Sequence, residues 1–168
     1  KEFFSFKTSD DVELNAYMIK PVDFDPSKEY PVLVTQYSGP ASQSVRDSWS
    51  FGWNNYLAQE GYIIVSVDPR GTGARGEEFR KITYKQLGHY ETIDLVETAK
   101  YLGKRDFIDK DRIGIWGWSY GGFMTCLSMT KGEGIFDAGI AVAPVTNWRF
   151  YDNIYTERFM RKPQQNKE

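Results

Sequence analysis

The sequence predicts an α/β fold in which a sheet of mostly parallel strands carries helices on both faces. After an opening stretch of about 20 residues, strand-like and helix-like segments alternate four times along the chain. This order is typical of parallel sheets with helical crossovers. The chain has 168 residues, of which 40% are hydrophobic and 16% aromatic. That is enough for about one domain with a buried core.

The strands are predicted from alternation and from β-branched runs. Residues 4–18 alternate between polar and apolar side chains around the turn Ser9-Asp10-Asp11, which predicts an antiparallel hairpin. The later strands are expected in short runs that are rich in β-branched and aromatic residues. These runs are 31–37, 62–68, 111–117 and 136–143.

The helices are predicted from apolar spacing and from the glycines that end them. Gly61 and Gly103 are expected to close two of them. The predicted helices are 54–60, 92–103, 120–130 and 147–160, whereas 21–31 and 69–80 are predicted to be loops.

Charge and composition exclude several function classes. The 21 Lys and Arg residues against 23 Asp and Glu give a net charge of −2, so nothing favours a nucleic-acid or anionic-membrane partner. No stretch approaches the roughly 18 apolar residues of a membrane span. The single cysteine, Cys126, excludes a disulfide framework and a cysteine-based zinc site. We expect no metal and no cofactor. The single histidine, His89, limits any mechanism that needs a histidine base.

Residues 117–121 carry the strongest chemical signal, the motif G-x-S-x-G. It follows a predicted strand and precedes a predicted helix, which is the context of a nucleophile elbow. In such a turn Ser119 projects out of the sheet, and small neighbours avoid clashes. The backbone N–H of Tyr120 then lies near the oxyanion that forms on attack. The alternative, a small-residue loop at a helix start, is less favoured because strand and helix are both in place.

A second glycine motif competes with it. Residues 71–76 read G-x-G-x-x-G after a strand, and Glu91 follows about 20 residues on, as in a dinucleotide-binding fingerprint. However, two residues separate the strand from the glycines, and the acidic Glu77 and Glu78 would repel a pyrophosphate. An ordered surface loop is therefore the favoured interpretation.

With further segments added, the chain resembles the prolyl oligopeptidase family of serine peptidases, in its dipeptidyl peptidase IV branch. The resemblance spans most of residues 31–160 in the family's order. Small departures are Ser38 and Phe123, the latter where tyrosine is usual. The matching segments are Tyr37-Ser38-Gly39-Pro40, Asp68-Pro69-Arg70-Gly71-Thr72-Gly73, Ile115 to Gly122, Ala141 to Trp148 and Tyr151 to Met160.

The resemblance implies an α/β-hydrolase domain that normally follows a β-propeller. It implies removal of N-terminal dipeptides from peptides with proline or alanine in second position. Ser119 matches the nucleophile, and Tyr37 matches the tyrosine whose hydroxyl joins the Tyr120 N–H in the oxyanion hole. Tyr37 also ends a predicted strand, where the sites of α/β proteins gather.

The resemblance further implies a pocket for the proline ring, formed by Val145, Trp148, Tyr151 and Tyr155 beside Tyr120. The spacing supports this, since the last three aromatic residues would share one face of a helix. A rigid aromatic wall suits a compact ring with no N–H to satisfy. Periodicity alone would instead favour a helix packed into the core.

We expect the catalytic acid and base to be missing from this chain. Asp68 and Glu91 are structural in the family, and His89 precedes Ser119 although the fold runs Ser…Asp…His. Residues 1–168 are thus predicted to be a partial, truncated α/β-hydrolase domain, without the propeller and the downstream Asp and His. The isolated chain is expected to be inactive.

Two alternatives stay open: a carboxylesterase or acylaminoacyl peptidase on the same fold, and a non-catalytic binding module. The last predicted strand, 136–143, would form an exposed apolar edge, which predicts self-association as a homo-oligomer. The resemblance suggests a periplasmic, cell-surface or secreted location and leaves the cytoplasm open.

Overall fold

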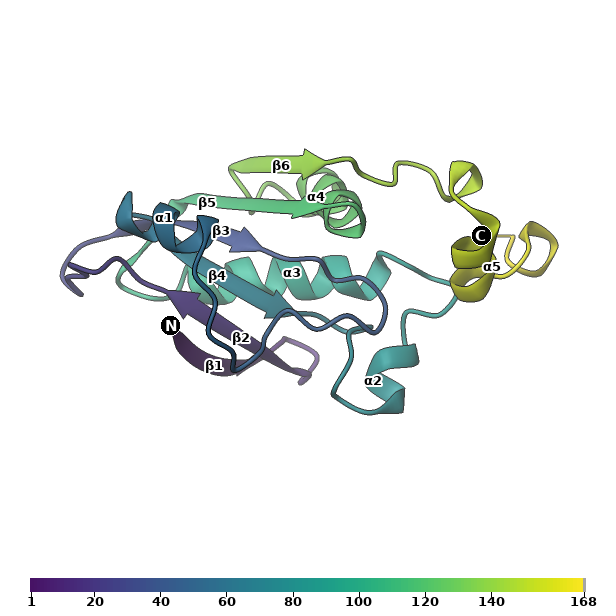
Figure 1. Cartoon of the computed structure of the whole chain (residues 1–168), viewed down its shortest axis with the longest axis horizontal. Helices are drawn as coiled ribbons and strands as arrows, with labels where there is room; N and C mark the ends of the chain where they lie inside the picture. The colour runs from purple at the N-terminus through teal and green to yellow at the C-terminus, as the bar shows by residue number, and fades with distance from the viewer. Residues whose placement is uncertain (168) are drawn as a thin grey trace.

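Six strands form one mixed sheet in the order β1-β2-β4-β3-β5-β6 (Figure 1). The computed structural model describes residues 1–167. β1 and β2 pair antiparallel, β2 runs antiparallel to β4, and β4, β3, β5 and β6 run parallel. The fold class predicted from the sequence is therefore confirmed. The strands are β1 (Glu2–Lys7), β2 (Glu13–Ile19), β3 (Tyr30–Thr35), β4 (Ile63–Asp68), β5 (Ile108–Trp118) and β6 (Ala138–Val142).

Helices cover both faces of this sheet unequally. α3 and α4 pack against each other and against β5, and α4 also packs against β6. α1 contacts β2 and β4 and lies on the opposite face of the sheet, where its side chains border a hollow with β3, β5 and β6. The helices are α1 (Trp53–Gln59), α2 (Glu77–Lys81), α3 (His89–Leu102), α4 (Tyr120–Lys131) and α5 (Asn153–Met160), with short 3-10 helices at Trp148–Phe150 and Pro163–Gln165.

The core lies between the central strands and the α3–α4 layer. Every residue of β4 is buried. The inward side chains of β3 and β5 meet α3 and α4 in one apolar cluster, which includes Val34, Ile115, Leu95, Ala99 and Met124. Because fully buried aliphatic side chains each contribute about 1.5–3 kcal/mol, this layer fixes the orientation of α4 against β5.

The outer strand β6 is far less covered. Among the described residues, 1–167, it pairs only with β5, and its residues are exposed apart from the half-buried Val142. Ile140 leaves 59% of its surface accessible. The exposed apolar edge predicted for residues 136–143 is therefore present, in a strand that is shorter than expected.

Two local predictions are wrong. Residues 69–80 are not all loop, because α2 begins at Glu77 with acidic residues in its first turn and basic residues in its last, as the helix dipole favours. Residues 147–160 do not form one helix. Asp152 is extended and its side chain accepts from Tyr155 N at 2.8 Å, so it caps a new helix there.

The carboxyl ends of the parallel strands all point toward the side of the molecule where α2 and α5 lie (Figure 1). In open α/β sheets this end gathers the loops that bind ligands. No helix within residues 1–167 is long and apolar enough to cross a membrane.

Candidate active site

Ser119 occupies a sharp turn between β5 and α4. Its backbone has φ 57° and ψ −114°, in a region that residues with a side chain rarely adopt. Two hydrogen bonds hold it there: Ser119 N donates to Val142 O at 2.9 Å, and Phe123 N donates to Ser119 O at 3.0 Å. The predicted nucleophile thus lies between the carboxyl end of β5 and the amino end of α4, as an elbow requires.

Close backbone approaches explain why glycine flanks this serine. A Cβ on Gly117 would lie 2.5 Å from the carbonyl carbon and oxygen of Gly121. A Cβ on Gly121 would lie 2.5 Å from Gln36 O and 3.2 Å from Tyr37 Cα. Real Cβ atoms do not come so near to backbone atoms, so both positions need glycine for space rather than for conformational freedom.

Gln36 fastens the end of β3 to the elbow. Its Nε2 donates to Gly121 O at 2.8 Å and to Thr125 Oγ1 at 3.3 Å. Its Oε1 accepts from Ser38 Oγ at 2.8 Å. All of these groups are buried, so the network is rigid as well as satisfied. Gln36 is not among the predicted site residues, although a polar residue directly after an apolar strand is a recognisable signal.

Tyr37 follows Gln36 and faces the elbow from the β3 side. Its ring centroid lies 6.2 Å from that of Tyr120, and 40% of its surface is accessible. Partial burial, and to a lesser extent the neighbouring Tyr151, raises the pKa of the Tyr37 hydroxyl. The hydroxyl therefore stays protonated near neutral pH and can donate a hydrogen bond, which is what an oxyanion donor must do.

An aromatic cluster surrounds Tyr120. The Trp148 ring lies 5.8 Å from Tyr120, stacks on Tyr155 at 5.7 Å with 7° between the ring planes, and meets Tyr151 edge-on at 5.8 Å. The predicted aromatic residues thus come together, but from a 3-10 turn, its end and α5 rather than from one helix face. Val145 is half-buried in the loop between β6 and this segment. Burial is the main cause that raises the pKa of Tyr155.

Phe123 also belongs to the aromatic cluster. It meets Trp148 edge-on at 5.4 Å and Tyr120 at 5.5 Å. Phe123 is not among the predicted site residues. Its place in the first turn of α4, directly after the elbow, is the sequence signal that could have indicated a position beside the site.

A buried carboxyl lies beneath the elbow. Tyr120 Oη donates to Glu91 Oε1 at 2.6 Å, and neither side chain reaches solvent appreciably. Burial raises the pKa of Glu91 to about 7, although the bonds from Tyr120 and from the Gly88 N–H act in the opposite direction. Burial and the Glu91 carboxylate together raise the pKa of the Tyr120 hydroxyl, so it stays protonated.

Three backbone N–H groups of the glycine-rich loop at residues 71–76 already donate hydrogen bonds within the chain. Gly71 N donates to Phe79 O at 2.9 Å, Thr72 N donates to Pro69 O at 3.2 Å, and Gly73 N donates to Ser42 O at 2.7 Å. A phosphate-binding loop needs these N–H groups free. The interpretation as an ordered loop is confirmed, but only part of it lies at the surface, since Gly71 and Thr72 are buried.

The other titratable candidates, His89 and Asp68, have partners other than Ser119. His89 is the first residue of α3 and is exposed, with its ring packed edge-on against Tyr90 at 4.9 Å. Asp68 accepts from the backbone N–H groups of Ser44 and Val45 at 2.8 and 2.9 Å, so it closes a loop. Within residues 1–167 no hydrogen bond joins His89 to Ser119, and no cluster of His, Cys, Asp or Glu could hold a metal.

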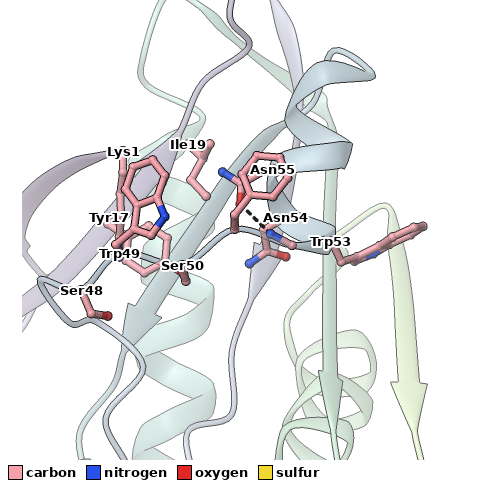
Figure 2. Close-up of a pocket in the computed structure, with 11 residues that line it drawn as sticks. Lys1, Tyr17, Ile19, Ser48, Trp49, Ser50, Trp53, Asn54 and Asn55 are labelled. Carbon is pink, nitrogen blue, oxygen red and sulfur yellow. Dashed lines mark hydrogen bonds between the residues drawn. The ribbon is translucent and has the colours of Figure 1, made fainter.

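Another hollow, of about 420 Å³, opens beside the start of α1, remote in sequence from the elbow (Figure 2). Lys1, Tyr17 and Trp49 are among the residues that line it, and Figure 2 shows Trp53 pointing away from Trp49. Asn55 Oδ1 accepts from Gly52 N at 3.1 Å and steadies its rim. None of the predicted site residues lines this hollow.

Comparison with known proteins agrees with this geometry. Residues 49–168 match the model of the prolyl oligopeptidase family. The chain is 49% identical over 167 residues to the "probable dipeptidyl-aminopeptidase B" of Arthroderma gypseum, covering 98% of this chain and 18% of that protein. It is 51% identical over 158 residues to the protein of the same name from Coccidioides posadasii, covering 93% of this chain and 17% of that protein.

A solved structure is similar throughout the described fold. The crystal structure of Porphyromonas gingivalis dipeptidyl peptidase 4 superposes with a TM-score of 0.97 at 58% sequence identity, covering 99% of this chain and 24% of that one. The chain therefore spans less than a quarter of the length of these relatives and carries the elbow and aromatic cluster within that part.

Proposed function

The chain belongs to the prolyl oligopeptidase family, and on that premise we propose that it is the nucleophile-bearing part of a serine exopeptidase that releases N-terminal dipeptides. One observation carries the proposal. Ser119 lies in a strained turn at φ 57°, and the residue after it, Tyr120, belongs both to that turn and to the aromatic cluster. The proposed nucleophile and an aromatic cluster are thus adjacent. The relatives named as dipeptidyl peptidases support the same reaction.

The proposed chemistry passes through an acyl-enzyme. Ser119 Oγ attacks the carbonyl carbon of the second substrate residue and transfers its proton to a general base. The backbone N–H of Tyr120 and the hydroxyl of Tyr37 stabilise the oxyanion. The amide bond breaks, the shortened peptide leaves with a proton from the base, and water then releases the dipeptide from Ser119.

The proposed substrate selectivity rests on the aromatic cluster beside Tyr120. Trp148 and Tyr155 lie parallel at 5.7 Å, with Tyr151 edge-on to both at 5.8 and 5.6 Å. Such flat walls favour a compact apolar ring, so we propose peptides with proline, or the smaller alanine, in second position. Val145 would complete the pocket from the loop after β6.

The general base must come from elsewhere. His89 is exposed at the start of α3 and makes no hydrogen bond to Ser119 within residues 1–167. We therefore propose that a histidine and an aspartate outside this chain complete the triad in a longer protein, and that the 168-residue chain alone is inactive.

The test uses the full-length protein that carries this chain, with Gly-Pro and Ala-Pro arylamides as substrates. Ser119→Ala should lower kcat/KM by at least about 1,000-fold, because removal of a triad nucleophile usually does. Ser128→Ala is the matched control: this serine is buried in α4 and should leave kcat/KM within about twofold. The isolated chain should not be labelled at Ser119 by a fluorophosphonate at a useful rate.

Each alternative has its own outcome. Fast hydrolysis of simple esters without arylamide cleavage would indicate an esterase instead. Peptide binding without any turnover would indicate a binding module. Rapid labelling of the isolated chain would contradict the proposed need for an outside base.

A further inference from the structure

Glu91 lies directly beneath the elbow, and the mechanism above gives it no part. We propose that Glu91 is a positioning residue that fixes the Tyr120 side chain and thereby sets the shape of the proline pocket. The inference rests on the function proposed above. Glu91 touches none of the reacting atoms, so any effect on the reaction must pass through Tyr120.

Both oxygens of the Glu91 carboxyl are engaged. Oε1 accepts from Tyr120 Oη at 2.6 Å, and Oε2 accepts from Gly88 N at 3.0 Å. Glu91 is 0% and Tyr120 2% accessible to solvent. Leaving a buried hydroxyl without an acceptor costs free energy. The hydrogen bond to Glu91 therefore favours a single orientation of the Tyr120 side chain.

The Glu91 carboxyl is itself held in place by the packing around Gly88. Gly88 precedes α3 at φ 89°, and a Cβ there would lie 2.5 Å from Leu127 Cδ1 and 2.7 Å from Phe123 Cζ. The start of α3 is therefore seated tightly on α4. Since Glu91 lies in the first turn of α3 and accepts from Gly88, its carboxyl is held by the contact between these two helices.

The Tyr120 ring transmits this position to the pocket. Its centroid lies 6.2 Å from Tyr37, 5.5 Å from Phe123 and 5.8 Å from Trp148. It is thus in contact range of the proposed oxyanion tyrosine on one side and the pocket wall on the other. A ring that turns toward solvent would alter the space for a proline ring more than the space for the smaller alanine.

The experiment measures selectivity in the full-length protein. The kcat/KM values for Gly-Pro and Gly-Ala arylamides are compared in Glu91→Ala, Glu91→Gln and Tyr120→Phe, and thermal unfolding is recorded for each. Glu97→Gln, on the same helix but bonded to Ser9 N, is the control. We expect Glu91→Ala to lower the Gly-Pro to Gly-Ala ratio about tenfold, mainly through KM.

Glu91→Gln and Tyr120→Phe test the same hydrogen bond with smaller changes of the side chain. Glutamine offers one acceptor oxygen to two donors, so Glu91→Gln should lower the ratio by an intermediate factor, about threefold. Tyr120→Phe keeps the ring but removes its anchor, so it should also lower the ratio. It provides the same measurement if Glu91→Ala does not fold.

The outcomes separate the two proposals. If the wild type cleaves the Gly-Pro substrate but every variant keeps the wild-type ratio, Glu91 is only structural and the inference fails alone. If kcat/KM falls by the same factor for both substrates and Tm falls as well, Glu91 is likewise only structural. If the wild type cleaves neither arylamide, the proposed function fails and the inference falls with it.

Discussion

The elbow and the outer strand β6 are neighbours with opposite character. At the elbow, backbone atoms approach so closely that Gly117 and Gly121 admit no Cβ. Along β6, by contrast, the residues pair with β5 but Ala138 to Ala141 lie exposed, and Val142 O accepts one further bond, from Ser119 N. Glycines at fixed positions in the sequence allow the close packing at the elbow, whereas the burial of an apolar strand depends on what lies beside it.

The largest expected effect tests the packing at the elbow. Gly121→Val would place side-chain atoms against Gln36 O and should destabilise the chain by more than about 3 kcal/mol, because overpacking against backbone cannot relax and β-branching disfavours the helix. Gly52→Val, at φ 176° with no atom near its Cβ, should change the free energy of unfolding by less than about 0.5 kcal/mol. Urea unfolding measures both, and equal effects would remove the contrast.

The next effect tests the charge buried beneath the elbow. The pKa of Glu91 is raised from 4.5 to about 7 in the folded chain. The unfolded state thus ionises first, and the contribution of Glu91 to stability is full below pH 4.5 and is lost as pH rises to about 7. This loss should amount to about 3 kcal/mol.

Glu91→Gln isolates this contribution because every other titrating group is retained. The stability of wild type minus that of Glu91→Gln should fall between pH 4.5 and 7 and then level off. Glu60→Gln, on the exposed end of α1, serves as the control. A difference that stays flat with pH would mean that Glu91 titrates in the folded chain as it does in the unfolded one.

The smallest effects compare identical substitutions in adjacent strands. Ile115→Thr, in the buried core of β5, should cost about 2 kcal/mol, because it removes apolar volume and buries a hydroxyl. Ile140→Thr, on exposed β6, should cost less than about 0.5 kcal/mol. It should also reduce the self-association predicted for this edge, as measured by light scattering. A monodisperse wild-type monomer would contradict that last expectation.

The sequence was sufficient where the signals were local. The hairpin, the parallel strands and the turn at Ser119 could all be predicted, because alternation, β-branched runs and glycine spacing report on short-range constraints. The interruption between the 3-10 turn at Trp148 and helix α5 was not predicted, although the sequence contains a signal for it. Asp152 is a strong N-cap residue, but apolar periodicity across it favoured one continuous helix.

The rest of the site depended on contacts between distant segments. Glu91 and Tyr120 are 29 residues apart, and Gln36 reaches Gly121 across 85. Nothing in the residues around Glu91 indicates that its carboxyl is buried, since α3 otherwise reads as an ordinary amphipathic helix. Only the packing of α3 on α4 reveals the partner.

The positive φ of Ser119 has an evolutionary consequence. Glycine adopts such a backbone without strain, and strain of this kind costs about 1–3 kcal/mol. A change to glycine at this position would therefore relax the turn while removing the hydroxyl that we propose as the nucleophile. Selection for stability alone would favour glycine at this position, so an alignment in which the relatives keep serine here would show that the hydroxyl itself is under selection.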